Sequence, residues 1–132
     1  FTLIELLVVI LILAVLMAIA LPLYLRAVKD SERQTCRSNM QTIANAEQAY
    51  RVRSAGHQYT ADLTLLVGPD EDLQALPRCP SNDGMVTTDD YTVDVDPVTN
   101  QLTIKCASAE AAFHNTVDGV ADVGFRPGID SE

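Results

Sequence analysis

The sequence has few of the residues and motifs on which catalysis and cofactor binding depend. It contains no tryptophan, and its two histidines, His57 and His114, belong to no Ser/His/Asp or Cys/His signature. It also contains no glycine-rich phosphate loop, no CxxC pair, no Cys/His zinc spacing and no EF-hand pattern. We therefore predict that the chain is not an enzyme and that it holds no metal ion.

Basic residues are also scarce, with nine lysines and arginines against 18 aspartates and glutamates and a net charge of −9. Nucleic acid is not expected as the main partner, because binding to phosphates requires a basic surface. Residues 26–53 hold six basic side chains against three acidic ones, whereas residues 54–132 hold three against fourteen. This imbalance fits repulsion that keeps the chain soluble, or pairing between acids of one copy and bases of another.

The longest apolar stretch opens the chain, where residues 1–25 read FTLIELLVVILILAVLMAIALPLYL and carry a single charge, Glu5. As a helix, this segment spans about 37 Å, which exceeds the ~30 Å hydrocarbon core of a bilayer. A secretory signal peptide fits poorly, because no basic residue precedes the apolar run and no small-x-small cleavage site follows it. We expect that a leader ahead of Phe1 has been removed and that the apolar segment remains as a membrane helix.

Glu5 is the unusual residue of this segment. A carboxylate among apolar side chains of a membrane helix costs several kcal/mol unless it is protonated or paired. The chain offers it no partner nearby except the α-amine of Phe1, about one turn away, which reaches it only in strained geometry. In a staggered stack of identical chains, Glu5 of one copy meets the Phe1 amine of its neighbour. Alternatively, Glu5 lies near the bilayer surface with its carboxylate among the lipid headgroups.

The run FTLIEL at residues 1–6, followed by the apolar stretch with Pro22, resembles the mature N-terminus of type IV pilins and type II secretion pseudopilins. The resemblance covers the first 25 residues closely and the first 55 in general form. It implies that a prepilin peptidase cleaves before Phe1 and methylates its amine, and that Glu5 is required for assembly. It also implies a precursor in the inner membrane and then, through the pilus assembly machinery, an extracellular helical filament of identical subunits.

The function expected on this basis is that of a major pilin, the structural subunit of a type IV pilus on the cell surface. Two alternatives stay open. One is a major pseudopilin of a type II secretion system, built in the same way but forming a short periplasmic piston. The other is a monomeric, membrane-anchored binding module that does not assemble.

Apolar periodicity predicts that the helix continues to residue 53. Its packed stripe consists of Cys36, Met40, Ile43, Ala44, Glu47 and Tyr50. Glu47 is expected at the edge of this stripe rather than buried, and Ser54-Ala55-Gly56 predicts the end of the helix. Pro22 predicts a kink or local melting over residues 17–22, because proline removes one backbone hydrogen bond and clashes with the carbonyl of Ala18.

The remaining chain predicts a small head over residues 54–132 and, with the helix over residues 1–53, an α+β fold. Asp62 and Asp70 are candidate caps of short helices in 61–67 and 72–76. Alternating residues in 91–96 and 101–106 predict an antiparallel hairpin, with further strands in 85–88 and in 111–114 or 120–125. The face of the hairpin expected to pack on the helix consists of Tyr91, Val93, Leu102 and Ile104.

The three cysteines form an odd set. Outside the cytoplasm a disulfide is expected, and a small domain gains most from one. Cys79 precedes the hairpin and Cys106 ends it, so the two can be neighbours across the sheet. We predict a Cys79–Cys106 disulfide with Cys36 as a buried thiol; a bond from Cys36 to either of the others is the alternative.

Calcium is the one cofactor left open, through scattered aspartates that could supply oxygen ligands. These are Asp89, Asp90, Asp94, Asp96, Asp118 and Asp122. The resemblance adds that major pseudopilins use calcium to hold a loop. Because scattered acids are usually solvated, no cofactor is expected.

Overall fold

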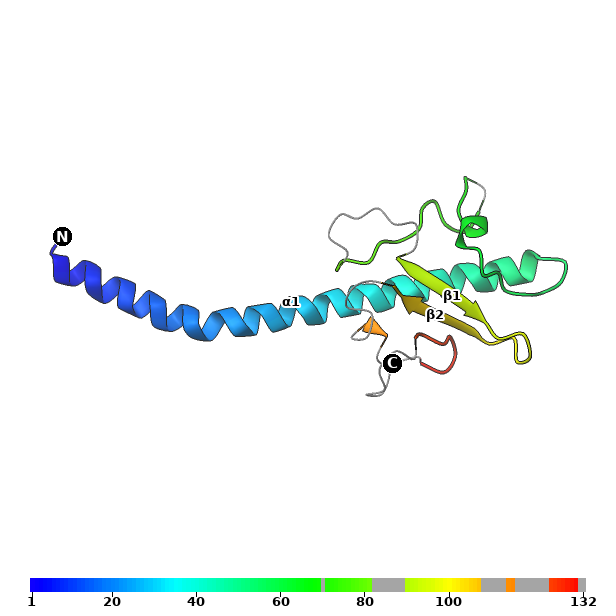
Figure 1. Cartoon of the computed structure of the whole chain (residues 1–132). Coiled ribbons are helices and arrows are strands. Elements are labelled where there is room, and N and C mark those ends of the chain that lie inside the picture. The colour runs from blue at the N-terminus through cyan, green and yellow to red at the C-terminus, as the bar shows by residue number, and fades with distance from the viewer. Residues whose placement is uncertain (70, 82–89, 108–113, 116–123, 131–132) are drawn as a thin grey trace. The chain divides into compact units, whose positions relative to one another are not determined.

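The computed structural model describes residues 1–69, 71–81, 90–107, 114–115 and 124–130 (Figure 1). Its elements are helix α1 (Leu3–Arg53), the 3-10 helix η1 (Leu63–Leu66) and strands β1 (Tyr91–Val95) and β2 (Leu102–Cys106). A long helix followed by a small antiparallel sheet confirms the predicted α+β fold. The chain forms two compact units, Phe1–Ser31 and Glu32–Glu132, so the boundary between them lies within α1.

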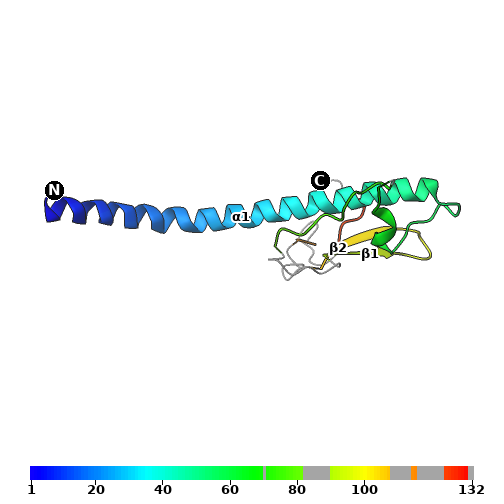
Figure 2. The same cartoon turned by 90° about the horizontal axis from the view of Figure 1, so that it is seen from above.

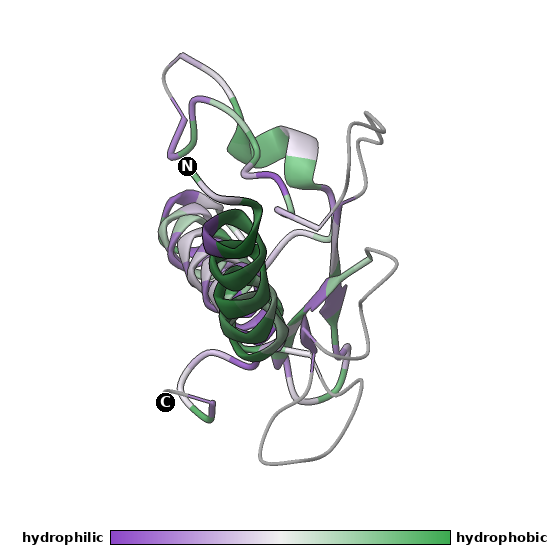
Figure 3. Ribbon diagram, turned by 90° about the vertical axis from the view of Figure 1, so that its left-hand side faces the viewer, coloured by the Kyte–Doolittle hydropathy of each residue, from purple (hydrophilic) through white to green (hydrophobic). Residues whose placement is uncertain are grey.

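In the first unit, the part of α1 up to Leu25 is apolar except for Glu5, and green predominates in this part of the helix (Figure 3). Every large apolar side chain from Phe1 to Leu25 is exposed, with exposed fractions of 45% or more. The mean hydropathy reaches 3.2 over an 18-residue window, and the helix is long and apolar enough to cross a membrane.

Pro22 lies inside α1, and both residues 17–21 before it and the residues after it are helical. The ribbon curves in its blue part, but the coil is not interrupted (Figure 1). The loss of one backbone hydrogen bond at a proline bends a helix without melting it when the flanking turns remain intact. The local melting predicted here is therefore absent from the single chain, and unwinding inside a filament stays a prediction.

The second unit includes the rest of α1, which buries one face. The buried side chains are Cys36, Met40, Ile43, Ala44, Ala46 and Glu47. They recur at three- and four-residue steps, which place side chains on the same face of a helix. The expectation that Glu47 lies at the edge of the stripe is wrong, because its side chain is fully buried. A hydrogen bond of 3.0 Å from the backbone N–H of Thr60 to Glu47 Oε2 makes this burial tolerable.

Helix α1 ends at Arg53, and residues 54–56 form the predicted turn. His57 closes it with a φ of 50° and an N–H that donates to the Ser54 carbonyl at 3.0 Å. Asp62 then caps η1 as predicted, because its Oδ1 accepts from the N–H of Thr64 at 3.0 Å.

The prediction of a second short helix over residues 72–76 is wrong. Leu73 instead forms an isolated parallel bridge with Val67, because its N–H donates to the Leu66 carbonyl at 3.0 Å and its carbonyl accepts from Gly68 at 3.0 Å. The two apolar clusters therefore hydrogen-bond to each other. Asp70, the candidate cap, lies outside the described residues.

Strands β1 and β2 pair antiparallel, with Tyr91 opposite Cys106 and Val95 opposite Leu102. Their connection is the predicted turn, in which Asp96 Oδ1 accepts the backbone N–H groups of Val98 and Thr99 at 2.7 and 3.1 Å. The predicted face of the hairpin is buried: Tyr91, Val93, Leu102 and Ile104. Figure 2 shows the hairpin beside the second half of α1, and both contribute to one hydrophobic core.

A third segment joins the sheet at Phe125. Its N–H donates to the Ile104 carbonyl at 2.6 Å, and the N–H of Ile104 donates to the Phe125 carbonyl at 2.9 Å, which makes an isolated antiparallel bridge. Phe125 thus lies where a strand over 120–125 was predicted. The predicted strand over 85–88, and residues 111–113 and 120–123 of the other two, lie outside the described residues.

Candidate functional site

The first candidate site is the start of α1, where Thr2 and Glu5 form a capping box. The N–H and hydroxyl of Thr2 both donate to Glu5 Oε2, at 2.7 and 3.0 Å, and the N–H of Glu5 donates to Thr2 Oγ1 at 3.3 Å. We expected no partner for Glu5 nearby in the chain. This expectation is wrong, because Thr2 forms hydrogen bonds with it. These hydrogen bonds do not neutralise the negative charge of the Glu5 carboxylate, and among the described residues Glu5 forms no ion pair.

The surface around Glu5 is apolar and open. Ile4, Val8 and Val9 line a shallow hollow with it on the side of the helix, and their exposed fractions are 68%, 45% and 49%. The hydrogen bonds from Thr2 both go to Oε2, so Oε1 takes no part in the capping box. Chemically, this arrangement presents one oriented carboxylate on an apolar helix, which suits a cation supplied by another molecule.

The second candidate site is a buried cluster of four side chains, Cys36, Cys79, Cys106 and His114, whose sulfur and nitrogen atoms all lie within 4.8 Å of one another. The sulfurs of Cys79 and Cys106 are 3.4 Å apart, and His114 Nδ1 is 3.6 and 3.5 Å from them. The exposed fraction is 3% or less for each of the four. Donor atoms of the kinds that bind soft metal ions are thus gathered out of contact with solvent.

Backbone and side-chain hydrogen bonds hold the cluster in place. The N–H of Cys79 donates to Asp90 Oδ2 at 3.2 Å. Asn115, next to His114, binds the end of β2 twice: its Oδ1 accepts from Cys106 N–H at 2.8 Å, and its Nδ2 donates to the Cys106 carbonyl at 3.0 Å. Ser81 Oγ lies 3.1 Å from His114 Nε2. The imidazole is therefore fixed from both sides.

Cys36 enters the cluster from α1. The hydroxyl of Tyr91 lies beside it and acts to lower the pKa of the Cys36 thiol. A hydrogen bond with Cys106 and burial together raise the pKa of the Cys36 thiol, so in the absence of a cation this thiol is neutral. Burial likewise raises the pKa of Tyr91.

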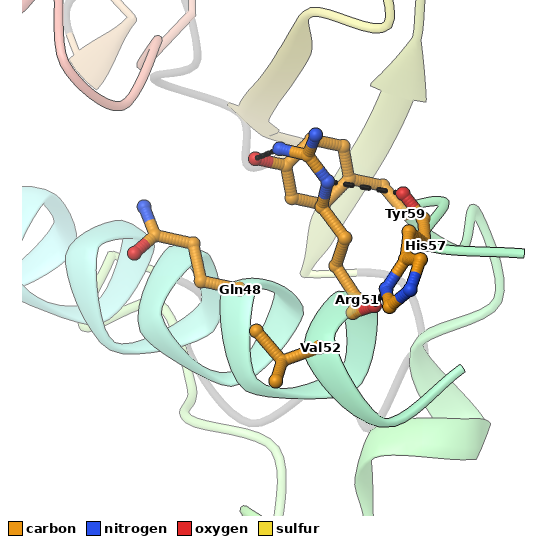
Figure 4. Close-up of a pocket in the computed structure, with 5 residues that line it drawn as sticks. All are labelled: Gln48, Arg51, Val52, His57 and Tyr59. Carbon is orange, nitrogen blue, oxygen red and sulfur yellow. Dashed lines mark hydrogen bonds between the residues drawn. The ribbon is translucent and has the colours of Figure 1, made fainter. Parts of the chain in front are cut away.

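A third feature is a surface pocket near the end of α1, lined by Gln48, Arg51, Val52, His57 and Tyr59 (Figure 4). Arg51 Nε donates to the His57 carbonyl at 3.0 Å, and its guanidinium lies 4.9 Å from the centre of the Tyr59 ring. These contacts tie the turn after the helix back onto α1.

The predicted site residues fall into separate groups. Phe1 precedes α1, and Glu5 and Pro22 belong to its first part, whereas Cys79 and Cys106 lie together in the core of the second unit. Their sulfur–sulfur distance of 3.4 Å is longer than the ~2.05 Å of a disulfide, and the structure holds both as thiols. The Cys79–Cys106 disulfide stays a prediction.

The aspartates considered for calcium do not converge within the described residues. Asp90 binds the backbone of Cys79 and Asp96 caps the hairpin turn, so both have structural roles. Asp89, Asp118 and Asp122 lie outside the described residues. Calcium binding therefore stays untested.

Sequence reasoning missed two participants. The capping role of Thr2 has a recognisable signal, since a Thr followed three residues later by Glu before an apolar run is a capping box. His114 has none, because its partners Cys79 and Cys106 lie 35 and 8 residues away and match no standard ligand spacing. Comparison with family models, curated proteins and solved structures gave no match to this chain.

Proposed function

We propose that this chain is a pilin-type structural subunit that assembles with identical copies through the first part of α1 into an extracellular filament. The single observation that carries the proposal is a charged carboxylate, Glu5, displayed on a fully exposed apolar helix. An anchor that only spans a bilayer has no need for this carboxylate, because a charge inside a membrane is costly. The resemblance of FTLIEL to the pilin N-terminus supports the same interpretation.

The capping box gives the carboxylate of Glu5 a defined orientation for assembly. Thr2 orients the carboxylate of Glu5 and satisfies one of its oxygens, so the remaining requirement is a positive charge. In the proposed assembly, that charge is the α-amine of Phe1 from a neighbouring copy. A charge-assisted hydrogen bond in an apolar setting is short and strong, and it fixes the axial stagger of neighbouring helices.

The exposed apolar surface supplies the remaining stabilisation. Packed against other copies, the side chains of residues 1–25 leave lipid or water together, and small residues such as Ala14, Ala18 and Ala20 allow close approach of helices. The acidic residues 54–132 then form the outer surface of the filament. Their net negative charge limits lateral aggregation of finished filaments.

The proposal is tested by separating the charge of Glu5 from its capping role. Glu5→Gln keeps an amide oxygen that accepts from Thr2 but removes the charge, whereas Glu5→Ala removes both. We expect both variants to insert into the membrane and neither to form filaments, as judged by membrane fractionation and electron microscopy. The matched control is Thr2→Ser, which keeps the capping hydroxyl and should assemble normally.

Normal filaments from Glu5→Gln would refute the charge-pairing mechanism. Deletion of the chain then distinguishes the expected function from its alternatives. Loss of long surface filaments indicates a pilin, whereas loss of protein secretion without loss of filaments indicates a pseudopilin. A membrane-anchored binding module predicts that Glu5→Ala leaves both insertion and function intact.

A further inference from the structure

We propose that Cys36, Cys79, Cys106 and His114 form a tetrahedral Zn²⁺ site that links α1 to the hairpin and to the C-terminal part of the chain. The four donors come from four separate segments: α1, the coil before β1, the end of β2 and the short segment at 114–115. Nothing in the spacing of these residues indicates a metal, so the inference depends on their convergence in the fold. It is independent of the proposed filament assembly.

Three of the six donor–donor distances, those among Cys79, Cys106 and His114, are close to the edges of a zinc tetrahedron, and the sulfur of Cys36 lies within 4.8 Å of the other donors. Zn–S bonds of about 2.3 Å and Zn–N bonds of about 2.0 to 2.1 Å give sulfur–nitrogen edges of about 3.5 Å and sulfur–sulfur edges of about 3.8 Å. The two measured sulfur–nitrogen distances are 3.6 and 3.5 Å, and the Cys79–Cys106 sulfur distance is 3.4 Å. Three sulfurs and one imidazole nitrogen are a common ligand set of structural zinc.

Ser81 orients the histidine for this role. Its Oγ lies 3.1 Å from Nε2 and can accept the proton of that nitrogen. The other nitrogen, Nδ1, then presents its lone pair to the sulfurs of Cys79 and Cys106. Histidine ligands of metals regularly donate their second N–H to an oxygen in this way, which fixes both the tautomer and the plane of the ring.

One neighbour of Cys36, the hydroxyl of Tyr91, can support a thiolate. Asn39 Nδ2 donates to the Tyr91 hydroxyl at 3.0 Å and to the Arg78 carbonyl at 2.8 Å, so the Tyr91 oxygen acts as an acceptor and its hydrogen remains available to another acceptor. A hydroxyl donor stabilises a metal-bound thiolate, which carries negative charge. A buried neutral thiol in a core has no such need.

A disulfide explains less of this cluster. A bond between Cys79 and Cys106 uses two of the three sulfurs and does not account for the position of His114 Nδ1 beside both of them. The metal uses all four groups. On binding, each of the three thiols loses its proton to solvent and His114 binds as the neutral imidazole, so the ion and its ligands carry one net negative charge.

The test begins with the unaltered full-length chain, purified in detergent without chelator or reductant. We expect about one zinc ion per chain by elemental analysis, and an X-ray absorption spectrum with sulfur and nitrogen neighbours near 2.3 and 2.0 Å. Replacement of Zn²⁺ by Co²⁺ should give the visible absorption bands of a tetrahedral thiolate complex. A chain without bound metal, in which mass spectrometry finds two cysteines joined by a disulfide, would overturn the proposal.

Variants assign the metal to these residues. Cys36→Ser and His114→Asn should each reduce the bound zinc at least about tenfold, because each removes one ligand. The matched control is His57→Asn, which changes the other histidine of the chain at an exposed position and should leave the zinc content unchanged. Equal zinc in all three variants would mean that the metal is bound elsewhere, which also refutes the site. The absorption measurements on the unaltered chain stand even if a variant fails to fold.

Discussion

Glu47 is a buried carboxyl group with one hydrogen bond, from the backbone of Thr60 to Oε2, and no partner for Oε1. Burial raises its pKa to about 7, although the bond from Thr60 acts in the opposite direction. The folded state therefore holds the proton of Glu47 up to a higher pH than the unfolded state, whose reference value is 4.5. Stability from this residue is greatest below about pH 4.5 and decreases as the pH rises through 7.

We predict that Glu47→Gln removes this pH dependence. Between pH 5 and pH 8, the original chain should lose on the order of 2 to 3 kcal/mol of unfolding free energy relative to the variant. The reason is that ionised Glu47 destabilises the folded state of the original chain. Thermal unfolding of both chains in detergent across this range measures it. Asp94→Asn, at an exposed position of β1, is the charge-matched control and should show little change. A pH-independent difference for Glu47→Gln would contradict the prediction.

At the level of single residues, the sequence predicts some positions and not others. The capping box of Thr2 and Glu5 is local, so it can be found from spacing alone. The burial of Glu47 depends on the backbone of Thr60, thirteen residues away, and periodicity cannot show that this N–H will be available. Convergence of the cysteines with His114 is likewise a property of the tertiary fold.

At the scale of elements, β2 is the centre of the sheet, because it pairs with β1 on one side and bridges to Phe125 on the other. Gly124 makes the second contact possible. A Cβ on this residue would lie 2.9 Å from the Ile104 carbonyl oxygen and 2.7 Å from Lys105 Cγ, and its φ is 76°. A side chain here would push the segment away from β2.

We predict that Gly124→Ala destabilises the fold by about 2 to 4 kcal/mol, because the substitution adds a backbone clash to the strain of a positive φ. Gly128→Ala is the matched control: its φ is 83°, but nothing lies within 4 Å of its Cβ position. It should cost only the conformational strain, about 1 kcal/mol. Chemical denaturation of the two variants measures the difference. Equal losses would show that close approach to β2 is unimportant.

The regular elements were the most predictable features. The stripe of α1 and the alternation of β1 and β2 are set by burial of one face, which leaves a direct pattern in the sequence. The region after the helix was less predictable. Leu73 and Val67 belong to short apolar clusters whose lengths fit either a helical turn or a strand, and pairing between the clusters decided the outcome.

At the scale of the whole chain, the two compact units differ in how they are stabilised. The residues of the hydrophobic core lie between Cys36 and Phe125, all within the unit Glu32–Glu132. The unit Phe1–Ser31 contributes none of them and exposes its large apolar side chains from Phe1 to Leu25. The unit Glu32–Glu132 is therefore stabilised by its own core, whereas the unit Phe1–Ser31 requires an apolar environment.

We predict that a chain beginning at Glu32 folds without the first unit. It should stay monodisperse in buffer without detergent, because the large apolar surface of residues 1–25 is removed. Its near-ultraviolet circular dichroism and its unfolding temperature should match those of the full chain in detergent. The full chain in the same detergent-free buffer is the control and should aggregate. Loss of tertiary structure in the shortened chain would contradict the division into independent units.

The distribution of the four clustered side chains along the sequence has a consequence for the order of events during biosynthesis. Cys36 leaves the ribosome early and His114 late, yet both must be present before the cluster is complete. Until then, the thiols remain open to oxidants in the surrounding compartment. We therefore expect rapid docking of the C-terminal residues onto β2 to limit mispairing of the cysteines, and slow docking to increase it.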